Sequence, residues 1–232
     1  MKAITFLLLV PILFSCRKGI TGSGNITSEI RRVGTFTSVR NSGDFNVIIN
    51  NGSSDNLTIN GDDNVIKLIS TSVVNNELVL KYNDQYNFKS HNPINITVST
   101  TTLNKISLNS SGKIQVTAVF NNSEYSLDVS GSGKIITPVS TNVFNATVAG
   151  SGSIDVSGTS NSEKLQVSGS GKIIGFHRSS SVDAAVTGSG SIEVTATNNL
   201  NIVISGSGKL FYKGYPTIQK IISGSGKVVN AN

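Results

Sequence analysis

Gly131-Ser132-Gly133-Lys134-Ile135 is the stretch of sequence that decides the fold, because it recurs through the second half of the chain. Gly-Ser-Gly followed by one polar and one aliphatic residue returns at 150–154, 169–173, 188–192, 206–210 and 224–228, and a degenerate copy lies at 110–114. The last glycines of the copies are 112, 133, 152, 171, 190, 208 and 226, so the steps are 21, 19, 19, 19, 18 and 18 residues. A sustained period near 19 predicts a repeat solenoid.

Alternating apolar residues flank every copy of the motif. The two apolar positions before the glycines hold Leu127 and Val129, Ala146 and Val148, Leu165 and Val167, Ala184 and Val186, and Ile202 and Ile204. The aliphatic position after them holds Ile114, Ile135, Ile154, Ile173, Ile192, Leu210 and Val228. Alternation with a period of two places these side chains on one face of each strand. We therefore expect a right-handed parallel β-helix whose interior is built from these columns.

The glycines are expected to form a structural corner between the two strands of each coil. Glycine adopts backbone angles that other residues avoid, and it leaves no side chain to collide with coils about 4.8 Å away. This role applies to Gly131, Gly133, Gly150, Gly152, Gly169, Gly171, Gly188, Gly190, Gly206, Gly208, Gly224 and Gly226. The serine column between them is expected to form a ladder of hydroxyl groups.

The first residues resemble an export signal. Lys2 is followed by an apolar run from Ile4 to Phe14, which is too short to span a bilayer. Leu13-Phe14-Ser15-Cys16 resembles a bacterial lipobox, so residues 1–15 are expected to be a signal peptide and Cys16 the lipidated residue. Cys16 is the only cysteine, so no disulfide is expected. Arg17 stands where an aspartate is linked to inner-membrane retention, which favours the outer membrane.

Three further segments follow the signal peptide. Residues 16–25 are expected to be the lipidated cysteine and a flexible linker, 26–102 a β-rich region without the strict repeat, and 103–232 the repeat β-helix. Strand-like runs lie at 44–49, 56–59, 77–82 and 94–98, and Asn75-Asn76 predicts a hairpin turn.

Composition narrows the choice of partners. Loss of Lys2 with the signal peptide lowers the formal net charge from +6 to +5, and the chain has no Trp. Proteins that bind nucleic acids typically have clustered arginines with stacking aromatic residues. This sequence has neither, so no nucleic-acid partner is expected. His91 and His177 are isolated, Asp62-Asp63 is expected to form a turn, and neither a metal nor a cofactor is expected.

The sharpest surface feature is a column of lysines at the position after Gly-Ser-Gly. The column holds Lys113, Lys134, Lys172, Lys209 and Lys227, and Ser153 and Ser191 interrupt it. Two residues later, the coils with serine carry Asp155 and Glu193. The same place in other coils holds Ile136, Ile174, Phe211 and Val229, which are expected to be exposed beside the lysines. One interpretation is charge balance on a solvated sheet, and it is preferred. The alternatives are a face that binds an anion or an acidic glycan, and a contact between subunits.

The repeated Gly-Ser-Gly-x-Ile units resemble the head GIN domain family, which is described as putative autotransporter adhesins and is common among bacterial lipoproteins. Further points of resemblance are residues 32–36, 42–49, 63–64 and 211–216. The resemblance covers roughly residues 30–230. It implies a β-helical fold and an envelope location, and it implies no established activity.

We therefore expect a non-catalytic lipoprotein of the cell envelope that serves adhesion, glycan binding or scaffolding. Its expected partners are the membrane, through the lipid, and a glycan or an envelope protein. The alternative is a polysaccharide-active enzyme built on a β-helix, for which a dense cluster of carboxylates and basic residues in a groove would be the mark.

Overall fold

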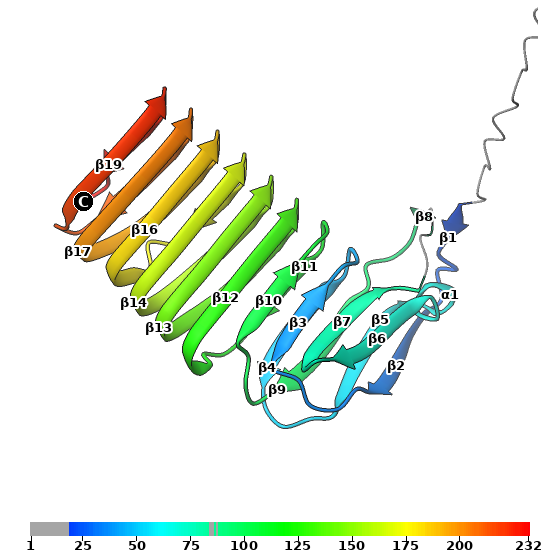
Figure 1. Cartoon of the computed structure of the whole chain (residues 1–232). Helices are drawn as coiled ribbons and strands as arrows, with labels where there is room; N and C mark the ends of the chain where they lie inside the picture. Colours follow the sequence, from blue (N-terminus) through cyan, green and yellow to red (C-terminus); the bar gives the residue numbers. More distant parts are fainter. Residues whose placement is uncertain (1–18, 84–85, 87) are drawn as a thin grey trace, which may run out of the picture.

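The computed structural model of the protein describes residues 19–83, 86 and 88–232. The chain winds into a β-solenoid of about seven turns with coils of about 19 residues (Figure 1). Two rows of strands enclose one apolar core, which confirms the predicted fold class. In the part of the chain that the structure describes, no helix has both the length and the apolar character to cross a membrane.

The first row of strands runs the full length of the solenoid. In order along the axis it comprises β6 (Ile69–Val74), β7 (Glu77–Tyr82), β3 (Ser38–Asn41), β10 (Lys105–Leu108), β12 (Asn121–Gly131), the second halves of β13 (Lys134–Gly150) and β14 (Ser153–Gly169), β16 (Arg178–Gly188), the second half of β17 (Ser191–Gly206) and β19 (Thr217–Gly224).

The second row lies across the core from the first. It comprises β2 (Ile26–Arg32), β5 (Asn56–Asp62), β9 (Asn95–Thr100), β4 (Asn46–Asn51), β11 (Lys113–Val116), the first halves of β13 and β14, β15 (Lys172–Ile174), the first half of β17, β18 (Lys209–Lys213) and β20 (Lys227–Asn230). Outside the two rows lie β1 (Ile20–Thr21), β8 (Phe88–Ser90) and the one-turn helix α1 (Asp63–Ile66).

Neighbouring coils pair in parallel and in register, so equivalent residues form columns. Leu127, Ala146, Leu165, Ala184 and Ile202 are consecutive partners and are buried. The column from Ile114 to Leu210 on the other row is likewise buried, as the alternation predicts.

The stack begins earlier than the repeat itself indicates. β3 and β4 already form a coil, because Val39 pairs with Ile106 and Val47 with Ile114. Beyond them, the antiparallel strands β6, β5 and β2 close that end of the solenoid. The hairpin predicted at Asn75-Asn76 is confirmed: it joins β6 to β7, and both residues have positive φ angles, 51° and 61°.

The last coil differs from the others at its core position. Lys220 on β19 pairs with the buried Ile202 of the preceding coil, so a lysine occupies the column that elsewhere holds Leu, Ala and Ile. β19 and β1 lie at opposite ends of the molecule (Figure 1). The solenoid therefore has one end near its N-terminal segment and one distal end.

The two glycines of each corner have different roles. Gly150 has a φ of 115°, whereas a Cβ on Gly152 would lie 2.5 Å from Val129 Cγ1 and 2.6 Å from the carbonyl oxygen of Gly133. The first glycine thus provides the left-handed backbone, and both permit close approach of the coil before them, since a Cβ on Gly150 would lie 2.7 Å from the carbonyl oxygen of Gly131. The corners of neighbouring coils are linked by backbone hydrogen bonds rather than by the predicted ladder of serine hydroxyls. The amides of Ser151 and Gly152 donate to the carbonyl of Gly131, at 3.0 and 2.8 Å.

Candidate functional site

The lysine column lies on the outer face of the second row, as the repeat spacing predicts. Lys113 pairs with Lys134, and Lys209 with Lys227, while Ser153 and Ser191 separate Lys172 from its neighbours. The Nζ of Lys134 lies 3.3 Å from Asp155 Oδ2, and both side chains are about 40% exposed (41% and 39%). This ion pair is one of the contacts that charge balance requires, whereas among the described residues Glu193 forms no ion pair with a lysine of the column.

The apolar residues beside the lysines are less exposed to solvent than the sequence predicts. Ile136, Ile174, Phe211 and Val229 were expected to be exposed, but each is only partly accessible. Glu193 accepts the backbone amide of Gly175 at 3.4 Å.

A polar cluster that sequence reasoning missed lies inside the solenoid. Glu163 Oε2 and His177 Nε2 are 2.8 Å apart, and both side chains are fully buried. Ser160 donates its hydroxyl to Glu163 Oε1, and the His177 ring meets Phe144 edge-on, with centroids 5.5 Å apart. Because the cluster is sealed from solvent, it suits a structural role rather than contact with a substrate.

The repeat alignment contained a signal for this cluster. Glu163 occupies the column that holds Tyr125, Phe144, Val182 and Leu200 in other coils. An acid in an otherwise apolar column needs a partner, since a buried unpaired charge is costly.

The segment that follows the predicted lipidation site is bound to the body. Cys16 lies outside the described residues, but β1 pairs with β8, and Asp62, Asp63 and Asn64 bind residues 21–25. Asp62 Oδ1 accepts the Gly24 amide at 2.8 Å, and Asp63 Oδ1 accepts the Ser23 hydroxyl at 2.6 Å. Residues 20–25, predicted to be part of a flexible linker, are therefore held in place.

These hydrogen bonds also change the pKa of the two aspartates. Hydrogen bonds from the side chain and backbone of Asn92, and from Gly24, lower the pKa of the buried Asp62 carboxyl below its usual value. Bonds from Ser23 and Asn25 lower the pKa of Asp63 in the same way. The Asp62-Asp63 pair, predicted to form a turn, opens α1 and also clamps the N-terminal segment.

His91 lies in a small group of aromatic and acidic residues near this clamp. Its Nε2 is 3.3 Å from Asp44 Oδ2, and the Tyr82 hydroxyl donates to Asp44 Oδ1 at 2.7 Å. Burial, together with the Asp44 carboxylate, raises the pKa of Tyr82. Among the described residues, no group of three or more His, Cys, Asp or Glu side chains is placed to hold a metal ion.

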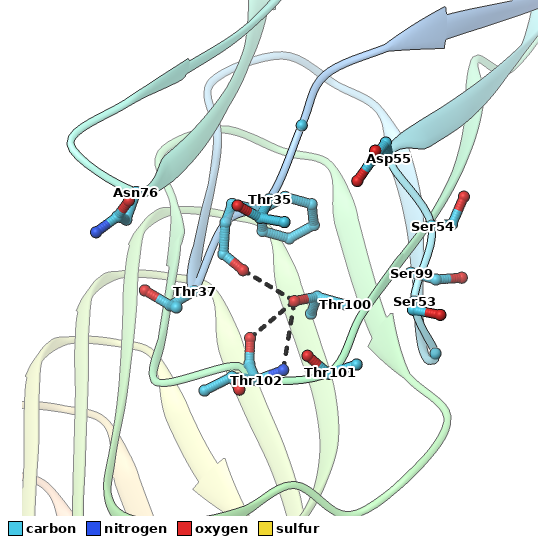
Figure 2. Close-up of a pocket in the computed structure, with 13 residues that line it drawn as sticks. Thr35, Thr37, Ser53, Ser54, Asp55, Asn76, Ser99, Thr100, Thr101 and Thr102 are labelled. Carbon is cyan, nitrogen blue, oxygen red and sulfur yellow. Dashed lines mark hydrogen bonds between the residues drawn. The ribbon is translucent and has the colours of Figure 1, made fainter.

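A hollow of about 230 Å³ lies where the first coils turn between the two rows, and Figure 2 shows its lining. Four separate segments meet there: 34–37, 52–55, Asn76 and 99–102. Hydroxyl side chains dominate the lining, and Asp55 supplies a carboxylate. Asp55 Oδ2 lies 3.6 Å from Arg32 Nη2, and the two side chains are 51% and 82% exposed, so this ion pair is weak.

The family match and a similar solved structure are both described as putative adhesins. Residues 35–216 match the family described as "Putative auto-transporter adhesin, head GIN domain". A putative adhesin of Bacteroides fragilis has a similar structure at 26% identity, with 91% of this chain and 100% of the other covered and a TM-score of 0.82. A search of curated proteins gave no match.

Two further solved structures share the fold. A putative lipid binding protein of Parabacteroides distasonis is 23% identical, with 93% of this chain and 100% of the other covered and a TM-score of 0.78. A putative adhesin of Parabacteroides merdae is 17% identical, with 92% and 99% covered and a TM-score of 0.75.

Proposed function

The chain belongs to the head GIN domain family of putative auto-transporter adhesins, and we propose that it is a non-catalytic lipoprotein of the cell envelope with an adhesin-like role. In this proposal Cys16 carries the lipid, and the solenoid presents its outer faces to a glycan or to another envelope protein.

The observation that carries the proposal is the extended, in-register solenoid with its N-terminal segment bound at one end. The coils repeat the same parallel pairing from β3 and β4 to β19 and β20. Such stacking produces long surfaces with equivalent residues at equal spacing, which is how repeat proteins bind extended partners. The bound segment at residues 20–25 would hold these surfaces at a defined position relative to the lipid.

The lysine column supports charge balance better than ligand binding. Lys134 already has its partner in Asp155, and exposed lysines repel one another only weakly in water. We therefore propose that the lysine face keeps the solenoid soluble and balanced, and that adhesion uses another surface.

Adherence of intact cells tests the proposed function. Cells that display the protein should adhere to glycan-coated and protein-coated surfaces more strongly than cells from which the gene is deleted. Cells with Lys134→Gln, Lys172→Gln and Lys209→Gln combined should adhere as the parent does. Equal adherence of the producing and deleted strains would contradict the adhesin role, and salt-sensitive adherence that the triple variant loses would instead assign it to the lysine face.

A further inference from the structure

The hollow at the first coils has a polar floor whose hydrogen bonds are incomplete. Thr100, which is 7% exposed, places its hydroxyl 2.8 Å from the carbonyl oxygen of Phe36 and 2.9 Å from that of Thr102 (Figure 2). A threonine hydroxyl has one proton, so it donates to only one of these two carbonyls at a time. The other carbonyl is left ready to accept a hydrogen bond from a ligand.

The walls of the hollow add both donors and acceptors. The hydroxyls of Thr35, Thr37 and Thr101 make no hydrogen bond to any residue that the structure describes, and all three line the hollow. The Asp55 carboxylate is only weakly paired with Arg32 and can accept from two hydroxyl groups at once. Hydroxyl groups that can both donate and accept, and one carboxylate that accepts, therefore line one small space.

The backbone around the hollow is fixed before any ligand arrives. The amides of Val33 and Gly34 donate to the carbonyl of Asp55, at 2.7 and 3.3 Å, and that of Thr37 donates to Asn76 at 2.9 Å. The amide of Gly52 donates to the carbonyl of Thr100 at 3.1 Å. These bonds link the four segments, so binding need not order a loose loop, and a site of this kind loses little affinity to ordering.

We propose that this hollow binds one uncharged sugar unit of a glycan, an inference that rests on the proposed adhesin-like function. Its volume, about 230 Å³, is below the roughly 300–1,000 Å³ of pockets that hold drug-sized ligands, and it suits a single ring. A sugar matches a lining of hydroxyl groups and one carboxylate, because each sugar hydroxyl both donates and accepts. The Asp55 carboxylate disfavours acidic sugars by repulsion, which distinguishes this site from the lysine face.

The same edge of the solenoid continues the polar surface away from the hollow. The Asn104 amide donates to the Thr37 carbonyl at 2.7 Å, and Asn104 lines a second hollow that shares Asn121, Asn122 and Ser123 with a third. These shallower hollows are also lined mainly by amide and hydroxyl side chains. Further units of the same glycan would lie along them.

A glycan array probed with the purified full-length protein tests the proposal. The array should carry neutral oligosaccharides that end in hexoses or N-acetylhexosamines, together with sialylated and sulfated ones. We expect retention on neutral glycans, with little dependence on salt. For the best neutral glycan, Asp55→Ala, and separately Thr35→Val with Thr101→Val, should raise Kd in titration calorimetry by about tenfold or more.

Matched controls separate the hollow from general surface effects. Asp183→Ala and Thr187→Val remove a carboxylate and a hydroxyl from the exposed outer face of β16 and should leave Kd unchanged. Thermal melts should show that all variants remain folded.

Three outcomes would overturn the proposal: no neutral glycan retained, neutral binding that the hollow variants leave intact, or retention of acidic glycans alone. The cell assay keeps the two proposals distinguishable. Cells that adhere equally with and without Asp55→Ala would refute the sugar site and leave the adhesin role standing. Binding of a neutral glycan by a protein that gives no adherence would do the reverse.

Discussion

Both glycines of a corner exclude side chains because the coil before them is close, and the first also has a positive φ. All the corner glycines were expected to adopt unusual backbone angles, but the structure places a positive φ at the opening ones, such as Gly150 and Gly188, and not at Gly152 or Gly190. Gly152 and Gly190 are required instead because the coil before them is too close: a Cβ on Gly190 would lie 2.4 Å from Val167 Cγ1.

Gly152→Val or Gly190→Val should therefore lower the free energy of unfolding by about 3 kcal/mol or more, because the added groups overlap backbone that cannot move. Ser151→Ala should cost about 1 kcal/mol or less, since the corner uses the serine amide and leaves its side chain exposed. Chemical denaturation of the three variants checks both values. A neutral effect of either glycine substitution would contradict the stacked corner.

The buried Glu163–His177 contact places an acid and an imidazole 2.8 Å apart, with both side chains fully sealed from solvent. Removing one partner leaves the other buried and unpaired, so Glu163→Leu or His177→Leu should each destabilise the protein by about 3–5 kcal/mol. The double variant should cost far less than the sum, because leucine suits the neighbouring apolar columns. A double-mutant cycle by denaturation measures the coupling, and additive losses would show that the contact contributes nothing of its own.

The last strand of the first row, β19, differs from the inner strands because one of its edges has no neighbouring strand among the described residues. β19 is the last strand of its row, and an open strand edge with an apolar face invites pairing with another chain. Lys220 places a charge on the core side of this strand, where it opposes such pairing.

Lys220→Ile should therefore promote association of molecules through their distal ends, which analytical ultracentrifugation would detect as a concentration-dependent increase in mass. Lys164→Ile, on the exposed outer face of β14, makes the same chemical change away from the end and serves as the control. Equal behaviour of the two variants would show that Lys220 does not protect the edge.

The clamp between α1 and the N-terminal segment should weaken in acid. Because folding lowers the pKa of Asp62, its contribution to stability is present above the unfolded value of about 3.9 and is lost as the pH falls below it. Hydrogen-exchange protection of the Gly24 and Asn92 amides, both of which donate to Asp62, should fall between about pH 5 and pH 2. In Asp62→Asn this pH dependence should be reduced; its persistence unchanged would assign it to other groups.

The sequence predicts the strands in which apolar and polar residues alternate strictly. It misses the coil whose corner is stabilised by hydrogen bonds from a side chain. The columns of Ile135 and Leu165 follow from periodicity alone. The coil of β3 and β4 was not predicted, because its corner lacks Gly-Ser-Gly. There the buried Asn41 takes over, accepting the Gly43 amide and donating to the Phe45 carbonyl, both at 3.1 Å.

The candidate sites were harder to predict for a related reason. The lysine column follows from spacing, but the hollow joins residues as distant in sequence as Thr35, Asn76 and Thr101. The Glu163–His177 contact likewise connects two different coils. Neither has a local motif, so both require knowledge of which segments the winding brings together.

At the scale of the whole molecule, β1 and the distal coil lie at opposite ends (Figure 1), and the predicted lipidation site, Cys16, precedes β1 in the sequence. Cys16→Ser should abolish incorporation of a fatty-acid analogue and leave the precursor uncleaved, because the thiol that carries the lipid is gone. Metabolic labelling followed by electrophoresis measures both effects, with Ser15→Ala as a control that keeps a small residue before the cysteine. Equal labelling of the parent and the Cys16 variant would refute the anchor.

Among the described residues of the repeat, the backbone of each coil hydrogen-bonds to the coil before it and the coil after it. Whole coils can therefore be lost or gained one at a time. Deleting residues 134–152 would join one corner directly to the next and remove one complete coil. The Glu163–His177 contact, the hollow and the clamp would all lie outside the deleted stretch. Each such loss or duplication would shift the distal end by about 4.8 Å relative to β1, so the length of the solenoid can change in discrete steps while the Glu163–His177 contact, the first hollow and the clamp are kept.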